Sequence, residues 1–465
     1  MPKPKIGVEI KTEGFRTVKI LEELGSGGQG TVYKVDYDGQ LKALKWYHDR
    51  AFDVLVNTGS PNASIRERVV DPDASAKKKK QFRENLKNNI KHGAPSDAFL
   101  WPQDITEETH GSFGYIMDLR PPEYIELSKL LLGRKYKFSS YQARVDGMLN
   151  LVNAFRVFHN KGFNYQDLND GNFFFNPNTG DLLVCDNDNA AYADYKTGII
   201  GKCRFMAPEV VLGQKMPDTL TDRFSMAVVL FFMLFRTHPL EGVRSTPACM
   251  TPSNEKKVYG SSPIFVFDPQ DSTNRPIRGV SDHAVLIWNR TPQYVKEAFE
   301  RSFSKGAMTF SLDSSLAAGG KYGASRLIEK EWINVLTRFR NDIVRCSNPN
   351  CSREEFFVGT NRKCASCGRL LWIGASLKLP KYEMPIHEGA QVYKVQLGPC
   401  ADSEALDVVA KVLSKNGSFG IKNVSGDDWH CITSTGADRV LRSGDGLPAK
   451  PGIRIATLNG SMEII

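Results

Sequence analysis

A glycine-rich string between two strand patterns sets the strongest limit on how the N-terminal part of this chain folds. The string Gly25-Ser-Gly-Gly-Gln-Gly-Thr-Val32 follows an alternating apolar run at residues 17–21, and its last two residues begin another such run at residues 31–35. A third run covers residues 41–45, and glycine-rich and Asp-Gly turns separate the three. This spacing predicts an antiparallel meander. A dinucleotide-binding fingerprint would instead place the glycines between a strand and a helix.

Glycines in such a hairpin bring backbone N–H groups over the phosphates of a nucleotide, while Val32 covers the base. Lys45 lies at the end of the third strand pattern, where its ammonium would neutralise phosphate charge. The next helical pattern, at residues 77–92, carries Glu84, which we expect to pair with Lys45 and hold it in place.

A loop dense with aspartate and asparagine follows the helical pattern at residues 141–159. It reads Tyr165-Gln-Asp-Leu-Asn-Asp-Gly-Asn172, and further on Asp186-Asn-Asp188 comes after an apolar run at residues 182–185. Met206-Ala-Pro-Glu209 lies beyond it, and Asp222 opens another helical pattern. In this order the motifs resemble those of the protein-kinase superfamily over about 325 residues.

The resemblance implies specific roles for these residues. The loop is similar to the catalytic loop H-R-D-L-x-x-x-N, so Asp167 would accept the proton of the acceptor hydroxyl and Asn172 would bind Mg²⁺. Asp186 stands in the place of the D-F-G aspartate, which holds magnesium against the phosphates of ATP. Asp222 resembles the aspartate that braces the catalytic-loop backbone. Arg326 is the expected salt-bridge partner of Glu209.

The implied catalytic residues are Asp167, Lys45, Glu84 and Asn172. The implied nucleotide contacts are Gly25, Gly27, Gly30, Val32, Ala43, Lys45, Met117, Asp118, Leu119, Asn172 and Asp186, with the adenine bound at the backbone that follows Met117.

Five positions depart from the kinase pattern. Tyr165-Gln166 replaces His-Arg, so activation by phosphorylation of the activation loop is not expected. Asn169 replaces a lysine whose charge helps at the transferring phosphoryl group, and losing one such donor costs about 3 kcal/mol in a transition state. Asn187 replaces a phenylalanine and should weaken a hydrophobic in/out switch. Asp188 replaces a glycine and offers an extra metal ligand.

A narrower resemblance rests on four strings: residues 93–102, residues 120–124, Cys185-Asp-Asn-Asp-Asn189 and Phe205-Met-Ala-Pro-Glu209. They are similar to a bacterial kinase group of tellurite-resistance-type loci. This resemblance implies a von Willebrand A protein and a metal-dependent phosphatase as partners.

Four of the nine cysteines fall close together near the end of the kinase-like region. Cys346 and Cys351 form one pair, and Cys364 and Cys367 form a second, which is the arrangement that tetrahedral S4 coordination of structural zinc requires. Free thiols or disulfides are the alternatives.

The expected fold class is α+β, a bilobal protein-kinase-like fold followed by a zinc ribbon and a small β-sandwich. The expected domains are an N-lobe at 15–118 with an insert at about 51–76, a C-lobe at 119–345, a zinc ribbon at 346–372 and a β-rich domain at 380–465. Short β-like runs at residues 392–397 and 453–458 mark the last of these, which faintly resembles a forkhead-associated domain.

Composition excludes several classes of protein. The longest apolar run, at residues 226–235, is too short to cross a membrane, and the N-terminus has no apolar core of a secretory signal. We therefore expect a cytoplasmic protein. No aromatic residues interleave the basic run at residues 77–80, so no nucleic-acid partner is expected.

The leading functional hypothesis is ATP- and Mg²⁺-dependent phosphorylation of Ser/Thr in protein substrates, including the protein itself. A nucleotide-binding scaffold with vestigial catalysis and a small-molecule kinase are the alternatives. Asn169, Asn187 and Asp188 motivate the scaffold hypothesis. The sequence identifies neither the substrate nor the activating signal.

Overall fold

The computed structural model describes residues 3–57, 68–109, 111–192, 201–245, 251–308, 326–351, 353–358 and 362–465. Part of the expected insert (58–67) lies outside the described residues. So do residues 193–200, which belong to the activation segment that the kinase resemblance implies between Asp186 and Glu209. Within the described part of the chain, no helix combines the length and the apolar character that crossing a membrane requires.

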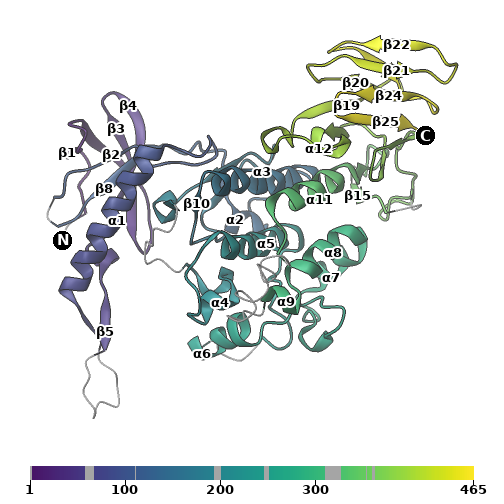
Figure 1. Ribbon diagram of the computed structural model, residues 1–465. Helices are drawn as coiled ribbons and strands as arrows, with labels where there is room; N and C mark the ends of the chain where they lie inside the picture. Colours follow the sequence, from purple (N-terminus) through teal and green to yellow (C-terminus); the bar gives the residue numbers. More distant parts are fainter. Residues whose placement is uncertain are drawn as a thin grey trace.

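The N-terminal part is built on a six-stranded antiparallel sheet, as the glycine-rich meander predicts (Figure 1). Its strand order is β1 (Glu9–Lys11), β2 (Thr17–Ser26), β3 (Gly30–Tyr37), β4 (Gln40–Tyr47), β8 (Gly114–Asp118) and β7 (Asp104–Ile105). Helix α1 (Pro72–His92) covers this sheet, and its Phe82 and Leu86 pack against Tyr47 and Tyr115 in one apolar cluster. The cluster fixes α1 on the sheet through burial of apolar surface.

The expected insert at 51–76 is not one irregular loop. The 3₁₀ turn η1 (Asp49–Phe52) leads to β5 (Leu55–Asn57), which pairs antiparallel with β6 (Arg68–Val70). Helix α1 then begins at Pro72, five residues before the predicted position. The reason is local: the Asp71 side chain accepts a hydrogen bond from Ala74 N, and proline at the first helical position is already set for a helix.

The next part is mainly helical, and its core lies between α3 (Tyr141–Asn160) and α5 (Thr219–Phe235). Two small sheets lie beside this core, β12 (Leu182–Val184), β11 (Phe173–Phe175) and β9 (Ile125–Glu126), and β10 (Phe163–Asn164) with β13 (Ala191–Tyr192). The other helical elements are α2 (Leu127–Leu132), η2 (Asn187–Asn189), η3 (Cys203–Phe205), α4 (Pro208–Val211), α6 (Pro252–Lys256), η4 (Lys257–Ser261), η5 (Ser272–Asn274), α7 (Asp282–Arg290), α8 (Gln293–Ser302), α9 (Lys305–Met308) and α11 (Glu329–Asn341).

A buried ion pair holds the end of the activation segment to this helical part. Arg326 Nη1 and Nη2 donate to the two carboxylate oxygens of Glu209 at 2.9 and 3.0 Å, and both side chains are buried. The predicted partnership is therefore present. Its bidentate geometry fixes α4 against the segment that precedes α11.

The C-terminal part begins with a cysteine-bearing hairpin, β14 (Ile343–Arg345) and β15 (Glu354–Phe356), and continues as two facing sheets (Figure 1). One sheet has the order β17 (Glu383–Pro385), β16 (Ser376–Lys378), β25 (Gly460–Ile464), β24 (Arg454–Thr457), β21 (Trp429–Ile432) and β22 (Asp438–Leu441). The other has the order β18 (Gln391–Tyr393), β19 (Val408–Lys415), β20 (Ser418–Asn423) and β23 (Gly446–Pro448). The apolar core between them includes Trp429 and Ile421.

One predicted strand in this region is wrong in its second half. The run at residues 392–397 stays extended only to Tyr393, and residues Lys394–Leu397 form the short helix α12. The 3₁₀ turn η7 (Asp402–Glu404) comes after α12. The Gln396 side chain accepts a hydrogen bond from Tyr393 N at 2.8 Å, which satisfies a backbone donor at the helix start.

The β-sheets of the C-terminal part are joined to the helical part through the end of α11. Asn341 exchanges hydrogen bonds with Gln391, and Arg340 forms an ion pair with Asp146 of α3 while donating to Gly389 O. Tyr393 lies in the same apolar core as α3 and α11. These contacts make the C-terminal sheets a packed extension of the helical part.

Candidate active site

Lys45 lies on β4 and is almost fully buried. Its ammonium makes ion pairs with Asp186 (Oδ1, 3.2 Å) and with Asp188 (Oδ2, 2.8 Å). Burial lowers the pKa of Lys45, but the two carboxylates outweigh burial and hold that pKa above its usual value. Lys45 is thus a charged group in a fixed position.

The predicted partner of Lys45 is wrong in the structure. Glu84 lies on the exposed face of α1, and the inward face of this helix carries Asn85 and Asn89 instead. Both amides donate from Nδ2 to Ala190 O, at 2.8 and 2.9 Å. Glu84 faces away from the site because it is next to the inward-facing Asn85, and neighbouring residues of a helix face different directions.

Asp188 is the residue that takes over this role. Its side chain is fully buried, and it accepts hydrogen bonds from Lys45 at 2.8 and 3.1 Å, from the Tyr47 hydroxyl at 2.7 Å and from the Tyr115 hydroxyl at 3.3 Å. A buried carboxylate persists only when it is paired and hydrogen-bonded, as this one is. Both of its oxygens are held by protein donors, so Asp188 is the partner of Lys45 here, and its use as an extra metal ligand stays a prediction.

Asn187 is also fixed by hydrogen bonds. Its side chain is fully buried, and its Nδ2 donates to Leu100 O and to Val184 O, each at 2.8 Å. Where a phenylalanine would pack against apolar side chains, the Asn187 amide thus bonds two backbone carbonyls, and these bonds hold η2 in one position.

The loop from Tyr165 to Asn172 is organised around Asp222. The Asp222 carboxylate accepts hydrogen bonds from Tyr165 N at 2.7 Å and from Gln166 N at 3.3 Å, which is the bracing that the kinase resemblance implies. Gln166 has a φ of 66° and Asp186 has a φ of 54°, a conformation uncommon for residues other than glycine. Such backbone conformations concentrate at functional sites.

His159 supports Asp222 from behind. Its two ring nitrogens lie 3.2 Å from Asp222 Oδ2 and 2.9 Å from Glu329 Oε1, and Arg223 also donates to Glu329. Burial lowers the pKa of His159, but the hydrogen bonds with the two carboxylates raise it to about 9. His159 is therefore a buried cation at neutral pH, and it links the catalytic-loop brace to the first residue of α11.

Asp167 lies at the centre of this loop. Its Oδ1 accepts a hydrogen bond from Asn169 Nδ2 at 3.0 Å, and its Oδ2 lies 3.4 Å from Asn189 Nδ2. Burial raises the pKa of Asp167 to about 6, and the hydrogen bond from Asn169 offsets part of that rise. A carboxylate with such a pKa is mainly ionised at neutral pH and is suited to accept a proton.

Asn172 and Asp186 provide oxygen atoms that suit Mg²⁺. Asn172 donates from Nδ2 to Asp167 O at 2.9 Å, which turns its amide oxygen away from that contact. Asp186 bonds Lys45 through Oδ1, and its side chain is 40% exposed whereas that of Asp188 is buried. Amide and carboxylate oxygens are hard ligands of the kind that Mg²⁺ binds, so these two residues fit the metal.

The expected nucleotide contacts come together around β3, β4 and β8. Ala43 pairs with Met117 and Lys42 with Asp118 across the sheet, and Val32 and Leu119 pack against the same apolar cluster. In the glycine-rich hairpin, a Cβ on Gly30 would lie 2.4 Å from Trp46 O, so strand packing requires glycine there. Gly25 and Gly27 have open space where a Cβ would point, so packing within the protein does not explain them.

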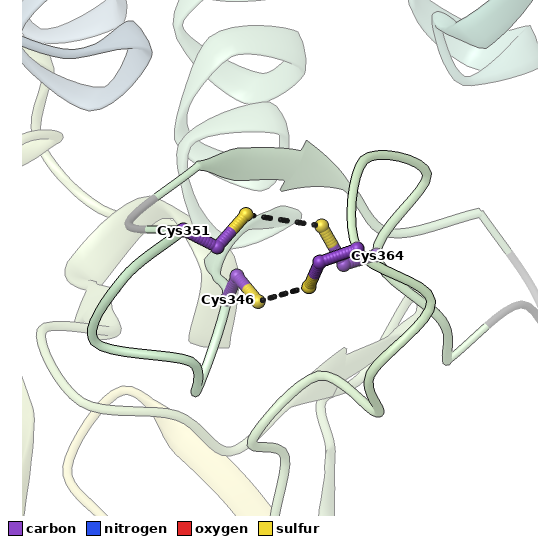
Figure 2. Close-up of side chains that lie close together, drawn as sticks. Cys346, Cys351 and Cys364 are labelled. Carbon is purple, nitrogen blue, oxygen red and sulfur yellow. Dashed lines mark hydrogen bonds between the residues drawn. The ribbon is translucent and has the colours of Figure 1, made fainter.

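The four clustered cysteines form a second site after α11 (Figure 2). Cys346 and Cys351 lie between β14 and β15, whereas Cys364 and Cys367 come from the segment that follows β15. Their sulfur atoms all lie within 4.8 Å of one another, with Cys346 3.5 Å from Cys367 and Cys351 3.8 Å from Cys364. Zinc with sulfur at about 2.3 Å in a tetrahedron places sulfurs about 3.8 Å apart. The arrangement therefore fits zinc, and four thiolates leave no open position for water.

The cysteine site is connected to the kinase-like part through Glu354. This residue of β15 accepts hydrogen bonds from Tyr141 N and Gln142 N, the first backbone donors of α3. A carboxylate is stabilising at a helix N-terminus, so the cysteine-bearing hairpin caps the central helix of its neighbour.

Several residues of the site were not predicted from the sequence. Tyr47 had a signal, since it lies two residues after Lys45 and so on the same face of β4. Tyr115, His159, Asn189 and Lys202, whose ammonium lies 2.8 Å from Asn169 Oδ1, come from segments distant in sequence. No pattern in the sequence distinguishes them.

Comparison with known families gives one match. Residues 110–277 match the family model described as Protein kinase domain. The matched segment contains the catalytic loop, Asp186 and Glu209, whereas the glycine-rich hairpin and Lys45 precede it. The chain therefore contains a protein kinase domain, which implies the use of ATP and a divalent metal and supports phosphoryl transfer in general. No curated protein matches the chain.

The first prediction concerns the partner of Lys45. We expect Asp188→Asn to lower ATP affinity at least tenfold, because Lys45 loses the charge that orients it, and tenfold corresponds to about 1.4 kcal/mol. Glu84→Gln should change the ATP affinity less than twofold, because Glu84 is exposed. Titration calorimetry with ATP and Mg²⁺ measures the affinity of both variants. Equal losses in the two variants would show that α1 supplies the partner after all.

The second prediction concerns pH. A histidine with a folded-state pKa of about 9 stabilises the fold fully below its unfolded pKa of 6.5, and this contribution is lost as the pH rises through 9. The free energy of unfolding, measured with urea between pH 6.5 and 9.5, should therefore fall more in the wild type than in His159→Gln. Parallel curves would exclude a charged His159. His159→Ala should cost about 3–5 kcal/mol at pH 7, because it leaves buried carboxylates unpaired.

The third prediction concerns the cysteines. We expect about one zinc ion per chain by elemental analysis of protein purified without chelator. Removal of the zinc ion should also lower the melting temperature of the kinase domain, because Glu354 of the cysteine-bearing hairpin caps α3. Cys351→Ser should reproduce this effect. Cys431→Ser, which changes a buried cysteine outside the cluster, serves as the control. Metal-free protein with four freely reactive thiols would contradict a zinc site.

Proposed function

We propose that the protein transfers the γ-phosphoryl group of ATP to serine or threonine hydroxyls of protein substrates, with Asp167 as the catalytic base. The observation that carries this proposal is the joint retention of Lys45, Asp167, Asn172 and Asp186, each held in place by hydrogen bonds of its own. A catalytic remnant would have no need of this support.

Each residue has a distinct part in the reaction. The oxygen of the acceptor hydroxyl bonds to the γ-phosphorus, and Asp167 accepts the proton of this hydroxyl. The bond between the γ-phosphorus and the β–γ bridging oxygen breaks, which releases ADP. Lys45, held by Asp188, neutralises charge on the nucleotide phosphates. When bound by Asn172 and Asp186, Mg²⁺ would neutralise the charge that develops on the phosphate oxygens. Asp222 keeps the loop backbone in the conformation that presents Asp167.

The departures from the kinase pattern on which the scaffold hypothesis rests have stabilising roles in the structure. Asn187 bonds two backbone carbonyls, Asp188 holds Lys45, and Asn169 bonds the Asp167 carboxylate. They support an enzyme with a fixed arrangement rather than one that switches between in and out states. Proteins as substrates are favoured by the segment ending at Glu209, which Arg326 anchors beside the site.

The two facing C-terminal sheets support a structural or protein-binding role for residues 376–464. They are packed on α11 through Asn341 and Arg340. We propose that the cysteine site, when it holds zinc, stabilises this junction.

The fourth prediction tests the proposed reaction. Wild-type protein with γ-labelled ATP and Mg²⁺ should label itself and a generic basic protein, and Asp167→Asn and Asp186→Asn should each lose at least 100-fold, as removal of a base or a metal ligand would require. Asp97→Asn, a change at a surface residue before Phe99, is the matched control and should keep full activity.

Three other outcomes would contradict the proposal in different ways. Unchanged transfer by Asp167→Asn would refute the base assignment. ATP binding without transfer would favour a nucleotide-binding scaffold. Transfer to metabolites but not to proteins would favour a small-molecule kinase.

A further inference from the structure

The catalytic loop carries no lysine of its own. Asn169 stands two residues after Asp167, where the kinase pattern has a lysine whose charge helps at the transferring phosphoryl group. An amide at this position does not supply that positive charge. The question is whether another part of the chain supplies it.

A lysine from the activation segment lies at this position in space. The Lys202 ammonium donates to Asn169 Oδ1 at 2.8 Å, although the two residues are 33 positions apart. A Cβ built on Gly171 would lie 3.1 Å from Asn169 Oδ1 and 3.4 Å from Lys202 Nζ. The ammonium therefore lies over the stretch of loop that separates Asp167 from Asn172, the two residues assigned to the base and the metal.

The backbone around Lys202 is shaped to reach this position. Gly201 has a φ of 81°, and a Cβ there would lie 3.0 Å from both Asp167 Oδ1 and Gln166 O. Only glycine allows the segment to approach the base so closely. On the other side, Phe205 N donates to Lys202 O at 2.9 Å, which starts the turn η3.

The charge of Lys202 is not neutralised by a close ion pair. Among the described residues, no carboxylate lies within 4 Å of its ammonium, and its hydrogen bond goes to a neutral amide oxygen. By contrast, Lys45 has two carboxylate partners. An ammonium held next to a base by a neutral acceptor keeps its charge available for an incoming anion.

We propose that Lys202 is a catalytic residue that supplies the cation missing from the catalytic loop. This inference rests on the proposed phosphoryl transfer. As the acceptor oxygen bonds to the γ-phosphorus and the β–γ bridging bond breaks, negative charge on the phosphoryl oxygens is stabilised by the Lys202 ammonium, while the proton passes to Asp167 and ADP leaves.

A charge exchange between the two positions tests this proposal. Lys202→Asn should lower kcat about 100-fold to 1,000-fold, the cost of one lost donor to a transition state, with KM for ATP changed less than threefold. The double variant Asn169→Lys with Lys202→Asn returns the cation to the loop and should recover at least tenfold over Lys202→Asn alone. Lys161→Met, which removes an exposed lysine at the end of α3, is the control and should leave kcat unchanged.

A binding measurement separates this role from a purely structural one. Lys202→Asn should weaken binding of ADP with aluminium fluoride and Mg²⁺, which imitates the phosphoryl group in transfer, at least tenfold by calorimetry. Its affinity for ADP and its melting temperature should match those of the wild type. Equal weakening of both ligands, or a lowered melting temperature with no rescue by the double variant, would assign Lys202 a structural role.

The outcomes also distinguish this inference from the proposed function. A wild type that transfers phosphate, together with a Lys202→Asn variant that retains kcat within threefold, overturns the role of Lys202 alone. A wild type that transfers nothing overturns the proposed function, and the inference falls with it.

Discussion

The ion pair between Lys45 and Asp188 joins two segments that lie 143 residues apart in the sequence, and the geometry of the site depends on it. Both side chains are buried, where an unpaired charge would be costly, so neither is stable in this position without the other. Two tyrosine hydroxyls from β4 and β8 complete the coordination of the carboxylate. The N-terminal sheet is thereby fixed to the segment that carries Asp186.

This pairing changes what α1 has to do. In a site where an acid on the helix holds the lysine, movement of the helix breaks the ion pair. Here α1 presents Asn85 and Asn89 to the backbone of Ala190, and Lys45 takes its orientation from Asp188. The orientation of Lys45 is thus independent of the outer face of α1, which agrees with the presence of Gln166 and Asn187 where the kinase pattern has arginine and phenylalanine.

A second set of buried charges connects the site to the C-terminal part. Asp222 holds the catalytic loop, His159 bridges Asp222 to Glu329, and Glu329 begins α11. The other end of α11 contacts the C-terminal sheets through Asn341, and the cysteine-bearing hairpin caps α3 through Glu354. The C-terminal sheets are therefore connected to the loop that carries Asp167 through contacts at the two ends of α11.

Elements whose cause is local can be derived from the amino-acid sequence. Alternating apolar residues and glycine turns predicted the meander, and the helical pattern at residues 141–159 predicted α3. The order and spacing of short motifs identified Asp167, Asn172 and Asp186 as candidate site residues. Pairings between distant segments depend instead on how the whole domain packs. Glu84 and Asp188 were both acids of the right type, and which of them reaches Lys45 depends on the rotation of α1 and the path of η2, which packing of the whole domain sets. For the same reason Lys202, with no signal in its own neighbourhood, came to lie beside Asn169: folding brings together charges whose separation along the chain says nothing about their distance in space.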